Sequence, residues 1–543
     1  MKNLLIALLL FPIILTAQAV KPSTNQINFG NVYEGTTDSV QIVLHNKEPR
    51  DLIITGFKFY TIYNKTPFFV KQNNFTIPFQ GSQSVWVYFS PKQNILHNSE
   101  MIIMHNGTSA YEPIDLIGQG KFSNTYYNST ENLSEEALKT ALKTRLGQGY
   151  NSLGYNNGRD LIFMTIDNKK TNGQGASVNT LECVYTGTTI TGYASRSAAQ
   201  SGNPQFNTEH TFPQGHFNSN EPMKSDIHHL FPTTNNSNSQ RGNKPFGNIS
   251  GGTASGGGSF YNNTTYEPRD AQKGRTARAL MYFVIRYQDY SSHFAGSETV
   301  LRQWHNAFPV DAIDRKRNND IYAAQNNRNP FIDYPQFEER ITNFVSNSVA
   351  PQSFGLDVLQ SSINFGAVIR AQADTFDYVL VNRGNKDILF SNFSLSNTSD
   401  FSFAANSGVN STLLPGEALQ ISVIVNAANT GTITGNLNFN TNIPGGQSSF
   451  VIPITAQSII VSVDEQSLSN QLSVYPNPMQ EKLFIRYEGN EKLDIRLLDA
   501  IGKQVELDYV ISNGFISTKD LLHGVYFLEI KKGDKRIVKK LVK

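Results

Sequence analysis

The sequence carries EHTFP at residues 209–213, SDIHHLFP at 225–232 and NSQRGN at 238–243, its densest run of chemically capable side chains. An acid stands next to a histidine, an Asp-x-His-His follows, and an asparagine-rich segment closes on Arg-Gly-Asn. A helix or strand built only for packing would carry Leu, Val, Ala or Lys at such positions. We therefore expect the middle of the chain to fold around a chemical site.

The bulk composition is that of a folded, multidomain protein. The chain has 543 residues, which predicts about three or four domains. Hydrophobic residues make up 39% and charged residues 17%, as in ordinary globular proteins. The net charge of +2 neither supports nor excludes a polyanionic partner. Cys183 is the single cysteine, so no internal disulfide forms, and its apolar surroundings predict a buried thiol rather than a nucleophile.

The N-terminus has the three parts of an export signal. A short basic start, MKN at 1–3, precedes the apolar run Leu4–Leu15 and the small residues up to Ala19. We expect cleavage near Ala17 or Ala19, which makes residues 1–19 a signal peptide. The alternative, a membrane anchor, is disfavoured because the run is short. No other stretch is apolar enough to span, so we expect an exported chain without stable membrane insertion.

Residues 20–122 predict a β-sandwich. The segments 39–44 and 84–89 are rich in β-branched and aromatic residues and are separated by Asn, Gly and Pro. Several short strands at such spacing are typical of a sandwich.

The same pattern returns at residues 352–458. INFG occurs at both 27–30 and 363–366, and an apolar strand that ends in Asn46 or Asn382 follows in each copy. The two modules resemble the immunoglobulin-like (Ig-like) modules found beside enzyme domains in exported proteins. Such a module serves as a spacer or as a glycan- or surface-binding unit. Plain structural packing is the simpler interpretation, because neither copy carries a cluster of ligand-like residues.

Residues 123–346 predict an α+β domain that is mostly helical. Ser134 is a candidate cap for a helix with acids in its first turn and Leu138, Leu142 and Leu146 along one face. The runs 161–164 and 184–185 predict strands, and the Gly- and Ser-rich run 250–259 predicts a flexible loop. Residues 273–287 are apolar almost all round, which predicts a buried central helix.

The end of the chain, residues 467–543, predicts a small β-sandwich after a linker that begins near Gln457. It contains YPNP at 475–478 and strand-like runs at 483–485, 494–498 and 524–530, with a turn at Gly502 and a basic end, KKLVK. The segment resembles the C-terminal sorting domain of type IX secretion cargo. That resemblance implies the type IX secretion machinery as a partner, and a protein that is secreted or held at the outer cell surface.

The central residues have the chemistry of phosphodiester hydrolysis. A neutral imidazole at His210 can take a proton from water. Carboxylate and amide oxygens are hard ligands that suit Mg²⁺ rather than Zn²⁺, and Mn²⁺ and Ca²⁺ suit the same donors. Because neighbouring side chains on a strand point to opposite faces, Glu209 and His210 share one site only if the backbone bends or if they flank a metal. Pro213 and Gly215 allow such a bend.

At these residues the sequence resembles the endonuclease I group of secreted or periplasmic nucleases, which carry a ββα-metal, or His-Me finger, site. The resemblance covers residues 123–346. It is carried by EHxxP, SDxHHLFP and NxxRGN with PFG at 245–247, and further by KGxxARA at 273–279 and QNNRNPFID at 325–333.

The resemblance implies a role for each matching residue. His210 is the expected general base, and Glu209 and Asn238 are the expected Mg²⁺ ligands, one from a β-hairpin and one from the helix after it. Asp226 and His228 are expected to orient the site. Four further residues are candidates for substrate contact or for structural support: Arg241, Asn243, Arg278 and Lys224.

Two of these assignments leave alternatives open. Arg241 either contacts a phosphate or forms a structural ion pair, and Arg278 either is buried in the structure or reaches a phosphate. Some family members place an arginine between the base and the Asp-x-His segment. Residues 211–225 contain no arginine and only Lys224 as a strong base, so the cation that stabilises the phosphate is not assigned by the motif.

The prediction is a secreted, Mg²⁺-dependent endonuclease with little sequence preference that cuts DNA, with RNA as a further candidate substrate. No zinc finger, basic zipper or other base-reading module is recognisable. One alternative is a zinc hydrolase that uses His210, His228, His229 and a carboxylate, although H-E-x-x-H is absent. The other is an inactive nuclease-like scaffold in a surface adhesin or binding protein. The oligomeric state is left open.

Overall fold

The computed structural model describes residues 19–543 except 48–49, 61–65, 108–112, 289–290, 406, 408–410, 446–447, 461–470, 488, 490–492, 500–502, 506–508, 511–514 and 534. The expected signal peptide lies outside the described residues apart from Ala19, and so does the expected turn at Gly502.

The first module is a two-layer β-sandwich. One sheet has the order β1-β3-β7-β5 and the other β2-β9-β8-β4-β6, and their inward side chains form one core. The predicted strands 39–44 and 84–89 lie within β3 and β7, so both are confirmed. The strands are β1 (Val20–Pro22), β2 (Gln26–Tyr33), β3 (Asp38–Asn46), β4 (Leu52–Tyr60), β5 (Phe68–Val70), β6 (Phe75–Ile77), β7 (Ser82–Phe89), β8 (Leu96–His105) and β9 (Pro113–Lys121).

The second module repeats this topology, with sheets β17-β19-β23-β21 and β18-β25-β24-β20-β22. Its strands are β17 (Leu356–Val358), β18 (Ile363–Ile369), β19 (Asp374–Asn382), β20 (Ile388–Leu395), β21 (Phe401–Phe403), β22 (Thr412–Leu413), β23 (Ala418–Val425), β24 (Gly431–Thr441) and β25 (Ser449–Ile459).

The repeated INFG segments make the same local structure in both modules. Asn28 Oδ1 accepts from the Gly30 backbone N–H at 2.9 Å, and Asn364 Oδ1 accepts from Gly366 N–H at 2.9 Å. The glycines have φ of +64° and +69°, a left-handed conformation that favours glycine. In each module the strand shifts register at this point. The sequence repeat therefore encodes a shared β-bulge.

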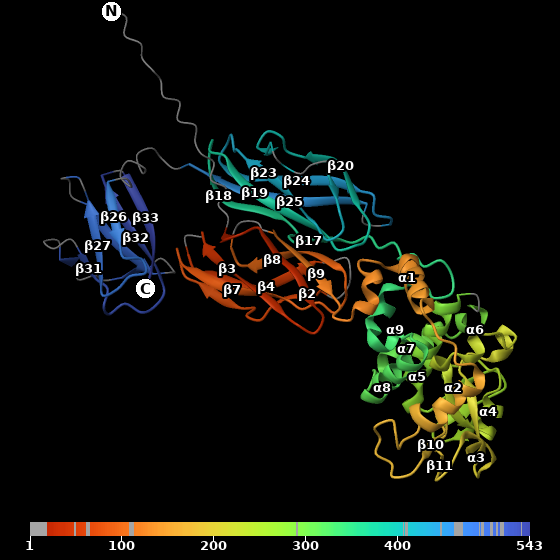
Figure 1. Cartoon of the computed structure of the whole chain (residues 1–543). Coiled ribbons are helices and arrows are strands. Elements are labelled where there is room, and N and C mark those ends of the chain that lie inside the picture. Colours follow the sequence, from red (N-terminus) through yellow and green to blue (C-terminus); the bar gives the residue numbers. More distant parts are fainter. Residues whose placement is uncertain are drawn as a thin grey trace, which may run out of the picture.

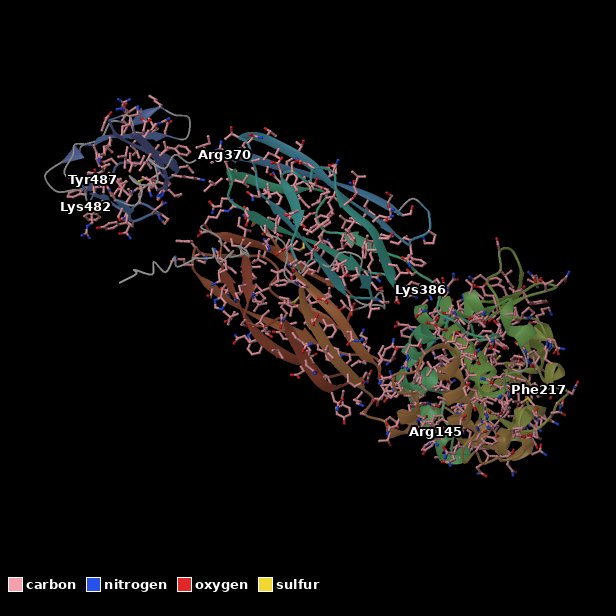
Figure 2. The ribbon with its side chains drawn as sticks, turned by 90° about the horizontal axis from the view of Figure 1, so that it is seen from above. Arg145, Phe217, Arg370, Lys386, Lys482 and Tyr487 are labelled. Carbon is pink, nitrogen blue, oxygen red and sulfur yellow. The ribbon has the colours of Figure 1, made fainter. Side chains whose placement is uncertain are left out.

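The two sandwiches pack against each other although the central domain separates them in sequence. Tyr60 and Ile102 of the first module form one buried cluster with Val379 and Val381 of the second. The Tyr60 hydroxyl also donates to Asp357 Oδ2 at 2.6 Å. Figures 1 and 2 show the two modules side by side in both views, with the central domain at one end of the pair.

The central domain combines helices, short strands and long irregular segments such as 167–179, so it is α+β. That it is mostly helical stays a prediction. Its α-helices are α1 (Glu135–Gly147), α2 (Tyr155–Leu161), α3 (Arg196–Ser201), α4 (Asn235–Arg241), α5 (Asp270–Tyr287), α6 (Ser291–Ala295), α7 (Glu298–Ala307), α8 (Ala312–Gln325) and α9 (Pro330–Asp333). The 3₁₀-helices are η1 (Thr125–Thr130), η3 (Gln214–Phe217), η4 (Met223–Ser225), η5 (Ile227–His229) and η6 (Pro335–Arg340), and η2 (Ile162–Ile166) is a π-helix. The strands are β10 (Thr180–Glu182), β11 (Thr189–Thr191), β12 (Phe206–His210), β13 (Leu230–Thr234), β14 (Thr253–Gly256), β15 (Ser259–Tyr261) and β16 (Tyr266–Glu267).

The two helices expected from apolar periodicity are confirmed. Helix α1 begins after Ser134 and buries Leu138, Leu142 and Leu146, although the Ser134 side chain makes no capping hydrogen bond. Helix α5 is buried along almost its whole length and runs through the middle of the domain core. It is the element on which the loops of the site rest.

Three expectations for this domain are wrong. Residues 161–164 end α2 and enter the π-turn η2 instead of forming a strand, because a short apolar run suits a buried helix as well as a buried strand. Residues 184–185 form the turn after β10. The run 250–259 is partly a hairpin of β14 and β15, and glycines with positive φ at 256–258 form its turn.

Arg340 fastens the central domain to the first sandwich. It is 1% exposed, its Nη1 donates to Asn94 Oδ1 at 2.6 Å, and its Nη2 donates to the carbonyl of Thr130 at 2.8 Å. A buried guanidinium bonded on both sides of a domain boundary fixes the two domains in one orientation.

The C-terminal module is a sandwich of sheets β26-β27-β31-β30 and β29-β28-β32-β33. The predicted strands at 483–485, 494–498 and 524–530 fall on β27, β28 and β32. Its strands are β26 (Leu472–Tyr475), β27 (Lys482–Tyr487), β28 (Asp494–Asp499), β29 (Gln504–Val505), β30 (Tyr509–Val510), β31 (Phe515–Ser517), β32 (Val525–Lys532) and β33 (Lys535–Val542). Across the described residues of all the modules, no helix has the length and apolarity needed to cross a membrane.

The packing of the two sandwiches should depend on pH through Glu100. This residue is 7% exposed. Burial, then hydrogen bonding to Asp115 and the charges of Asp115 and Glu417, raise the pKa of Glu100 to about 9, against a smaller opposite effect of the Ala418 backbone N–H. The folded state therefore favours the protonated acid. The stability that this group contributes is complete below about pH 4.5, its ordinary pKa, and is lost as the pH rises to about 9.

We expect Glu100→Gln to melt at a higher temperature than the wild type at pH 8, with the difference shrinking toward pH 5. Thermal melting monitored by circular dichroism at both pH values measures this. Asp38→Asn, which changes an exposed carboxylate of the same sandwich, is the control. A difference that stays constant between pH 5 and pH 8 contradicts the prediction.

Candidate active site

A β-hairpin and the helix that follows it place the central motif. Strands β12 and β13 pair antiparallel, with Glu209 opposite Phe231 and His210 opposite Leu230. Helix α4 begins directly after β13, and the side chain of its N-cap, Thr234, accepts from the backbone N–H of Ser237. The unit brings residues from 206–210 and 235–241 together, as the resemblance implied.

Glu209 is a buried carboxylate, and one of its two oxygens is already bonded to neighbouring side chains. It is 2% exposed. The Tyr185 hydroxyl donates to Oε1 at 2.7 Å, and Nη1 of Arg241 lies 3.1 Å from the same oxygen. Burial raises the pKa of Glu209, and the charge of Arg241 and the Tyr185 hydrogen bond oppose that rise. Within the described residues no hydrogen bond uses Oε2, so this oxygen can serve as a ligand.

His210 has the geometry of a general base. Its Nε2 lies 3.1 Å from the backbone carbonyl of Lys224. Because a carbonyl only accepts, this contact assigns the proton to Nε2 and leaves the Nδ1 lone pair for a substrate proton. Burial, and then the charges of His229, Arg241 and Lys224, lower the pKa of His210 to about 3. The imidazole is therefore neutral at physiological pH.

Arg241 contacts both Glu209 and His210. It is 1% exposed. Its Nη1 donates to the His210 carbonyl at 2.9 Å, and its Nη2 donates to the Thr211 carbonyl at 2.6 Å. With the ion pair to Glu209, one guanidinium fixes both neighbours where β12 ends. Of the two roles open for Arg241, this geometry favours the structural ion pair over contact with a phosphate.

Asn238 supplies a second hard oxygen. It is half-buried in the middle of α4, and its side-chain amide has no hydrogen bond among the described residues. The donors offered by Glu209 and Asn238 are one carboxylate oxygen and one amide oxygen, which fit a hard divalent cation that keeps open positions.

The zinc alternative finds no support in this geometry. In the part of the chain that the structure describes, no group of three or more His, Cys, Asp or Glu side chains could hold a metal ion. The three imidazoles proposed for it point their Nε2 atoms at different backbone carbonyls: His210 at Lys224, His228 at Asn327 and His229 at Met223.

Asp226 anchors the loop between the strands. It is 0% exposed. Its Oδ2 accepts from Tyr282 at 2.7 Å, from Arg286 at 2.9 Å and from Tyr287 at 2.8 Å, all on α5, and its Oδ1 accepts from Gln325 at 3.0 Å. Burial alone would raise the pKa of Asp226, but Arg286 and the nearby histidines outweigh it and hold the pKa well below its usual range. The carboxylate is ionised and orients the loop.

The remaining candidates lie in different surroundings. Arg278 is buried and bonds the Phe308 carbonyl and Asp314, both at 2.8 Å, as a structural arginine does. Asn243 is exposed and lies beside Gly215. Lys224 is half-buried, and its Nζ lies 5.1 Å from the ring centroid of Tyr155.

The sequence did not point to three residues that shape the site. Tyr185 holds Glu209, Arg286 holds Asp226, and the ring of Tyr155 lies 5.5 Å from that of His210. For Arg286 a signal exists, because a charged residue in an apolar helix needs a buried partner. Nothing local distinguishes the two tyrosines from core residues.

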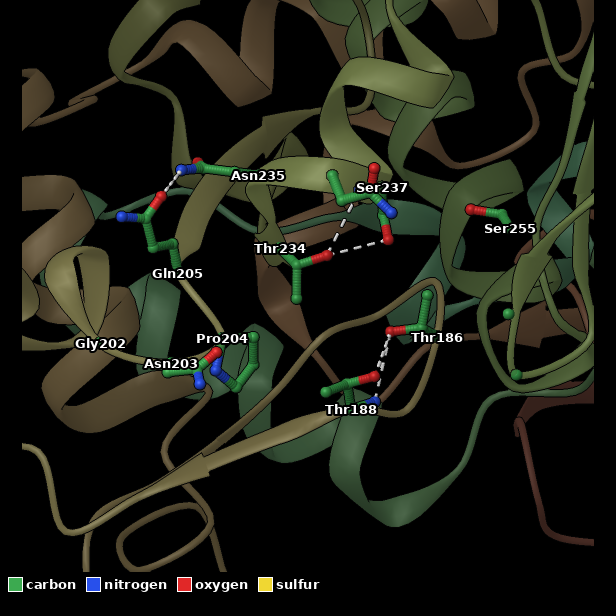
Figure 3. A pocket seen from close by; sticks show the side chains of 13 residues that line it. Thr186, Thr188, Gly202, Asn203, Pro204, Gln205, Thr234, Asn235, Ser237 and Ser255 are labelled. Atoms are coloured by element: carbon green, nitrogen blue, oxygen red, sulfur yellow. Dashed lines mark hydrogen bonds between the residues drawn. The ribbon is translucent and has the colours of Figure 1, made fainter.

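A polar cavity of about 710 Å³ opens beside the first turn of α4 (Figure 3). Neither Glu209 nor His210 lines it, and its walls are amides, hydroxyls, glycines and one proline, without a charged side chain. The lining residues are Thr186, Thr188, Gly202, Asn203, Pro204, Gln205, Thr234, Asn235, Asn236, Ser237, Ser255, Gly256 and Gly257.

We expect Asp226→Asn to destabilise the protein by about 3–5 kcal/mol, because it leaves the buried charge of Arg286 without its partner. Equilibrium urea unfolding, followed by tryptophan fluorescence and circular dichroism, measures the change. Asp320→Asn, which breaks the more exposed pair with Lys316, should cost less than about 1 kcal/mol. Equal losses in the two variants would contradict a central role for Asp226.

Comparison with known families agrees with this division of the chain. Residues 134–336 match the model for endonuclease I, and residues 473–543 match the secretion system C-terminal sorting domain. Residues 20–119 and 355–457 match a HYDIN/CFA65/VesB-like Ig-like domain. The sandwiches on either side of the central domain are therefore Ig-like.

Extracellular nucleases are among the similar proteins. The extracellular ribonuclease of Bacillus subtilis (strain 168) is 33% identical over 241 residues, which cover 40% of this chain and 78% of the relative. That of Bacillus amyloliquefaciens is 32% identical over 237 residues, with the same coverage. An extracellular deoxyribonuclease of Aeromonas hydrophila is 30% identical over 117 residues, or 20% of this chain and 50% of the relative.

Proposed function

Because the chain belongs to the endonuclease I family of nucleases, we propose that it is an exported, Mg²⁺-dependent endonuclease that cuts DNA and RNA with little sequence preference. Its class as a phosphodiester hydrolase and its export follow from the family domain, the sorting domain and the extracellular relatives. The observation that supports the proposed roles is the neutral His210, whose Nδ1 makes no hydrogen bond among the described residues, next in the chain to Glu209, whose Oε2 makes none there either.

In the proposed mechanism, His210 Nδ1 takes a proton from a water molecule as the water oxygen attacks phosphorus. The P–O bond to the leaving sugar oxygen breaks, and that oxygen takes a proton from solvent. The Lys224 carbonyl keeps the Nε2 proton in place and so holds the basic tautomer. Arg241 holds the His210 backbone and the Glu209 carboxylate during this step. A divalent cation held by Glu209 and Asn238 would supply positive charge to the phosphate oxygens.

Mg²⁺ is the proposed ion. Nucleases of this family depend in general on a divalent metal. One carboxylate and one amide oxygen suit a small hard cation that keeps most of its waters, and Mn²⁺ and Ca²⁺ can occupy the same donors.

The proposed breadth of substrate rests on two arguments. The similar proteins include both ribonucleases and a deoxyribonuclease. The residues gathered at the site are suited to phosphate and water rather than to base edges, so contacts to the backbone should dominate and affinity should fall steeply with salt. An inactive scaffold is less consistent with a site that keeps its base, its two oxygen donors and the residues that hold them.

We expect His210→Ala to lower the rate of plasmid and total RNA cleavage by about 10²–10⁴-fold, because the general base is lost. A chelator should abolish wild-type cleavage, and Mg²⁺ but not Zn²⁺ should restore it. Gel assays of both substrates, with circular dichroism to check the fold, measure this. His45→Ala, which changes a histidine of the first sandwich, should cleave normally. Full activity in chelator or in His210→Ala would refute the assignment.

We also expect the exported protein to lack the sorting segment 467–543. The type IX machinery is the proposed partner of that segment, and the mature enzyme needs only the modules before it. Intact-mass measurement of protein recovered outside the cells tests this. Recovery of the exported chain with the segment still attached would contradict it.

A further inference from the structure

Two cations near His210, Arg159 and Lys224, form no ion pair with a carboxylate among the described residues, although the charge of Asp160 acts on Arg159. Two buried arginines of this domain are paired with carboxylates, Arg241 with Glu209 and Arg278 with Asp314. Arg159 and Lys224 are half-buried, and neither forms an ion pair with a carboxylate in the described ranges. A partly desolvated charge without a counterion is a site where an anion binds favourably.

Both cations lie over one aromatic ring that also touches the base. The guanidinium carbon of Arg159 is 4.1 Å from the ring centroid of Tyr155, and Lys224 Nζ is 5.1 Å from it. The ring of Tyr155 lies 5.5 Å from that of His210, with 30° between the planes. An aromatic ring holds a cation without using its N–H donors, so both side chains keep donors for a ligand.

The donors of these side chains are largely unused. Arg159 donates from Nη2 to Asn156 Oδ1 at 2.7 Å and also hydrogen-bonds the Tyr155 side chain, while its buried Nε has no hydrogen-bond partner among the described residues. The Lys224 ammonium makes no hydrogen bond within the same ranges. A guanidinium with free N–H groups matches the oxygens of a phosphate.

The backbone fixes α2 at this position. Gly158, next to Arg159, is buried, and a Cβ there would lie 2.9 Å from Cγ2 of Ile227 and 3.5 Å from the Ser225 carbonyl oxygen. Helix α2 therefore packs directly on the segment that contains Asp226. The same segment begins at Lys224, whose carbonyl holds His210 Nε2. The base and both cations thus belong to one framework.

We propose that Arg159 and Lys224 bind the phosphodiester backbone of the nucleic acid next to the bond on which His210 acts, with Tyr155 as the residue that positions them. This inference rests on the proposed nuclease function. Some family members contact the phosphate with an arginine that lies between the base and the Asp-x-His segment. Residues 211–225 contain no arginine, and the inference assigns this contact to Arg159 of α2. The substrate then enters between α2 and the β12–β13 hairpin.

The test separates binding from cleavage. Anisotropy of a labelled DNA duplex is measured with Mg²⁺ at several salt concentrations, using the full chain with His210→Ala so that the duplex stays intact. Adding Arg159→Ala or Lys224→Ala should weaken binding about tenfold. Each change should also reduce the slope of log K against log salt by about one, as expected for one lost phosphate contact. Arg159→Lys should recover part of the affinity.

Arg145→Ala is the matched control. Arg145 also lies over a tyrosine, with its guanidinium carbon 3.7 Å from the Tyr126 ring centroid, but it sits on α1. Figure 2 places it across the domain from Phe217, whose ring is 6.4 Å from that of His210. Its removal should leave affinity and salt slope unchanged.

In the active protein, Arg159→Ala should raise KM about tenfold with a smaller change in kcat, and the melting temperature should stay within a few degrees of the wild type. An unchanged salt slope in both variants, or an equal effect of Arg145→Ala, would overturn the inference. If the wild type cuts no nucleic acid but binding still depends on Arg159, the proposed function fails and the binding surface stands.

Discussion

The site depends on one buried carboxylate. Asp226 receives three hydrogen bonds from α5, and thereby fixes a loop to the central helix of the domain. A buried charge needs such compensation, because desolvation costs several kcal/mol. The loop then presents the carbonyls of Met223 and Lys224, which hold His229 and His210. The Nε2 proton of His210, the proposed base, is thus held by a loop that is itself fixed to the core.

Glu209 and His210 are neighbours on a strand, where side chains point to opposite faces, and Arg241 holds both residues at once. Its guanidinium is almost completely buried, and it is compensated by the ion pair with the Glu209 carboxylate and by hydrogen bonds to the carbonyls of His210 and Thr211. Because it uses only Oε1 of Glu209, the other oxygen stays available as a ligand. The charge of Arg241 also opposes the rise in the pKa of Glu209 that burial causes. Arg241, for which the sequence left phosphate contact or a structural ion pair open, thus makes the ion pair and holds the backbone at His210 and Thr211.

Sequence patterns predict structure that depends on residues close together in the chain, and they miss structure that depends on distant contacts. Periodicity is local, so it found α1, α5 and the sandwich strands, and it failed at residues 161–164, where a short apolar run suits two structures. The motif singled out Glu209, His210 and Asn238, whose roles stay proposals, because the proposed chemistry needs those residue types close in the chain. Arg159 escaped notice because its relation to His210 is made by packing of α2, and the small residue that permits it, Gly158, has no local signature.

The two Ig-like sandwiches constrain the same site from outside. They pair through Tyr60, Ile102, Val379 and Val381, so the domain between them must begin and end at one place. It does so, since Lys139 of α1 donates to the Ser346 carbonyl at 2.7 Å. An insertion with adjacent ends leaves its host fold intact. Arg340 sits at this junction, and Figure 1 shows α2 and α4 in the part of the domain away from the sandwiches. The sandwiches therefore hold the domain by one end, where its first and last segments meet.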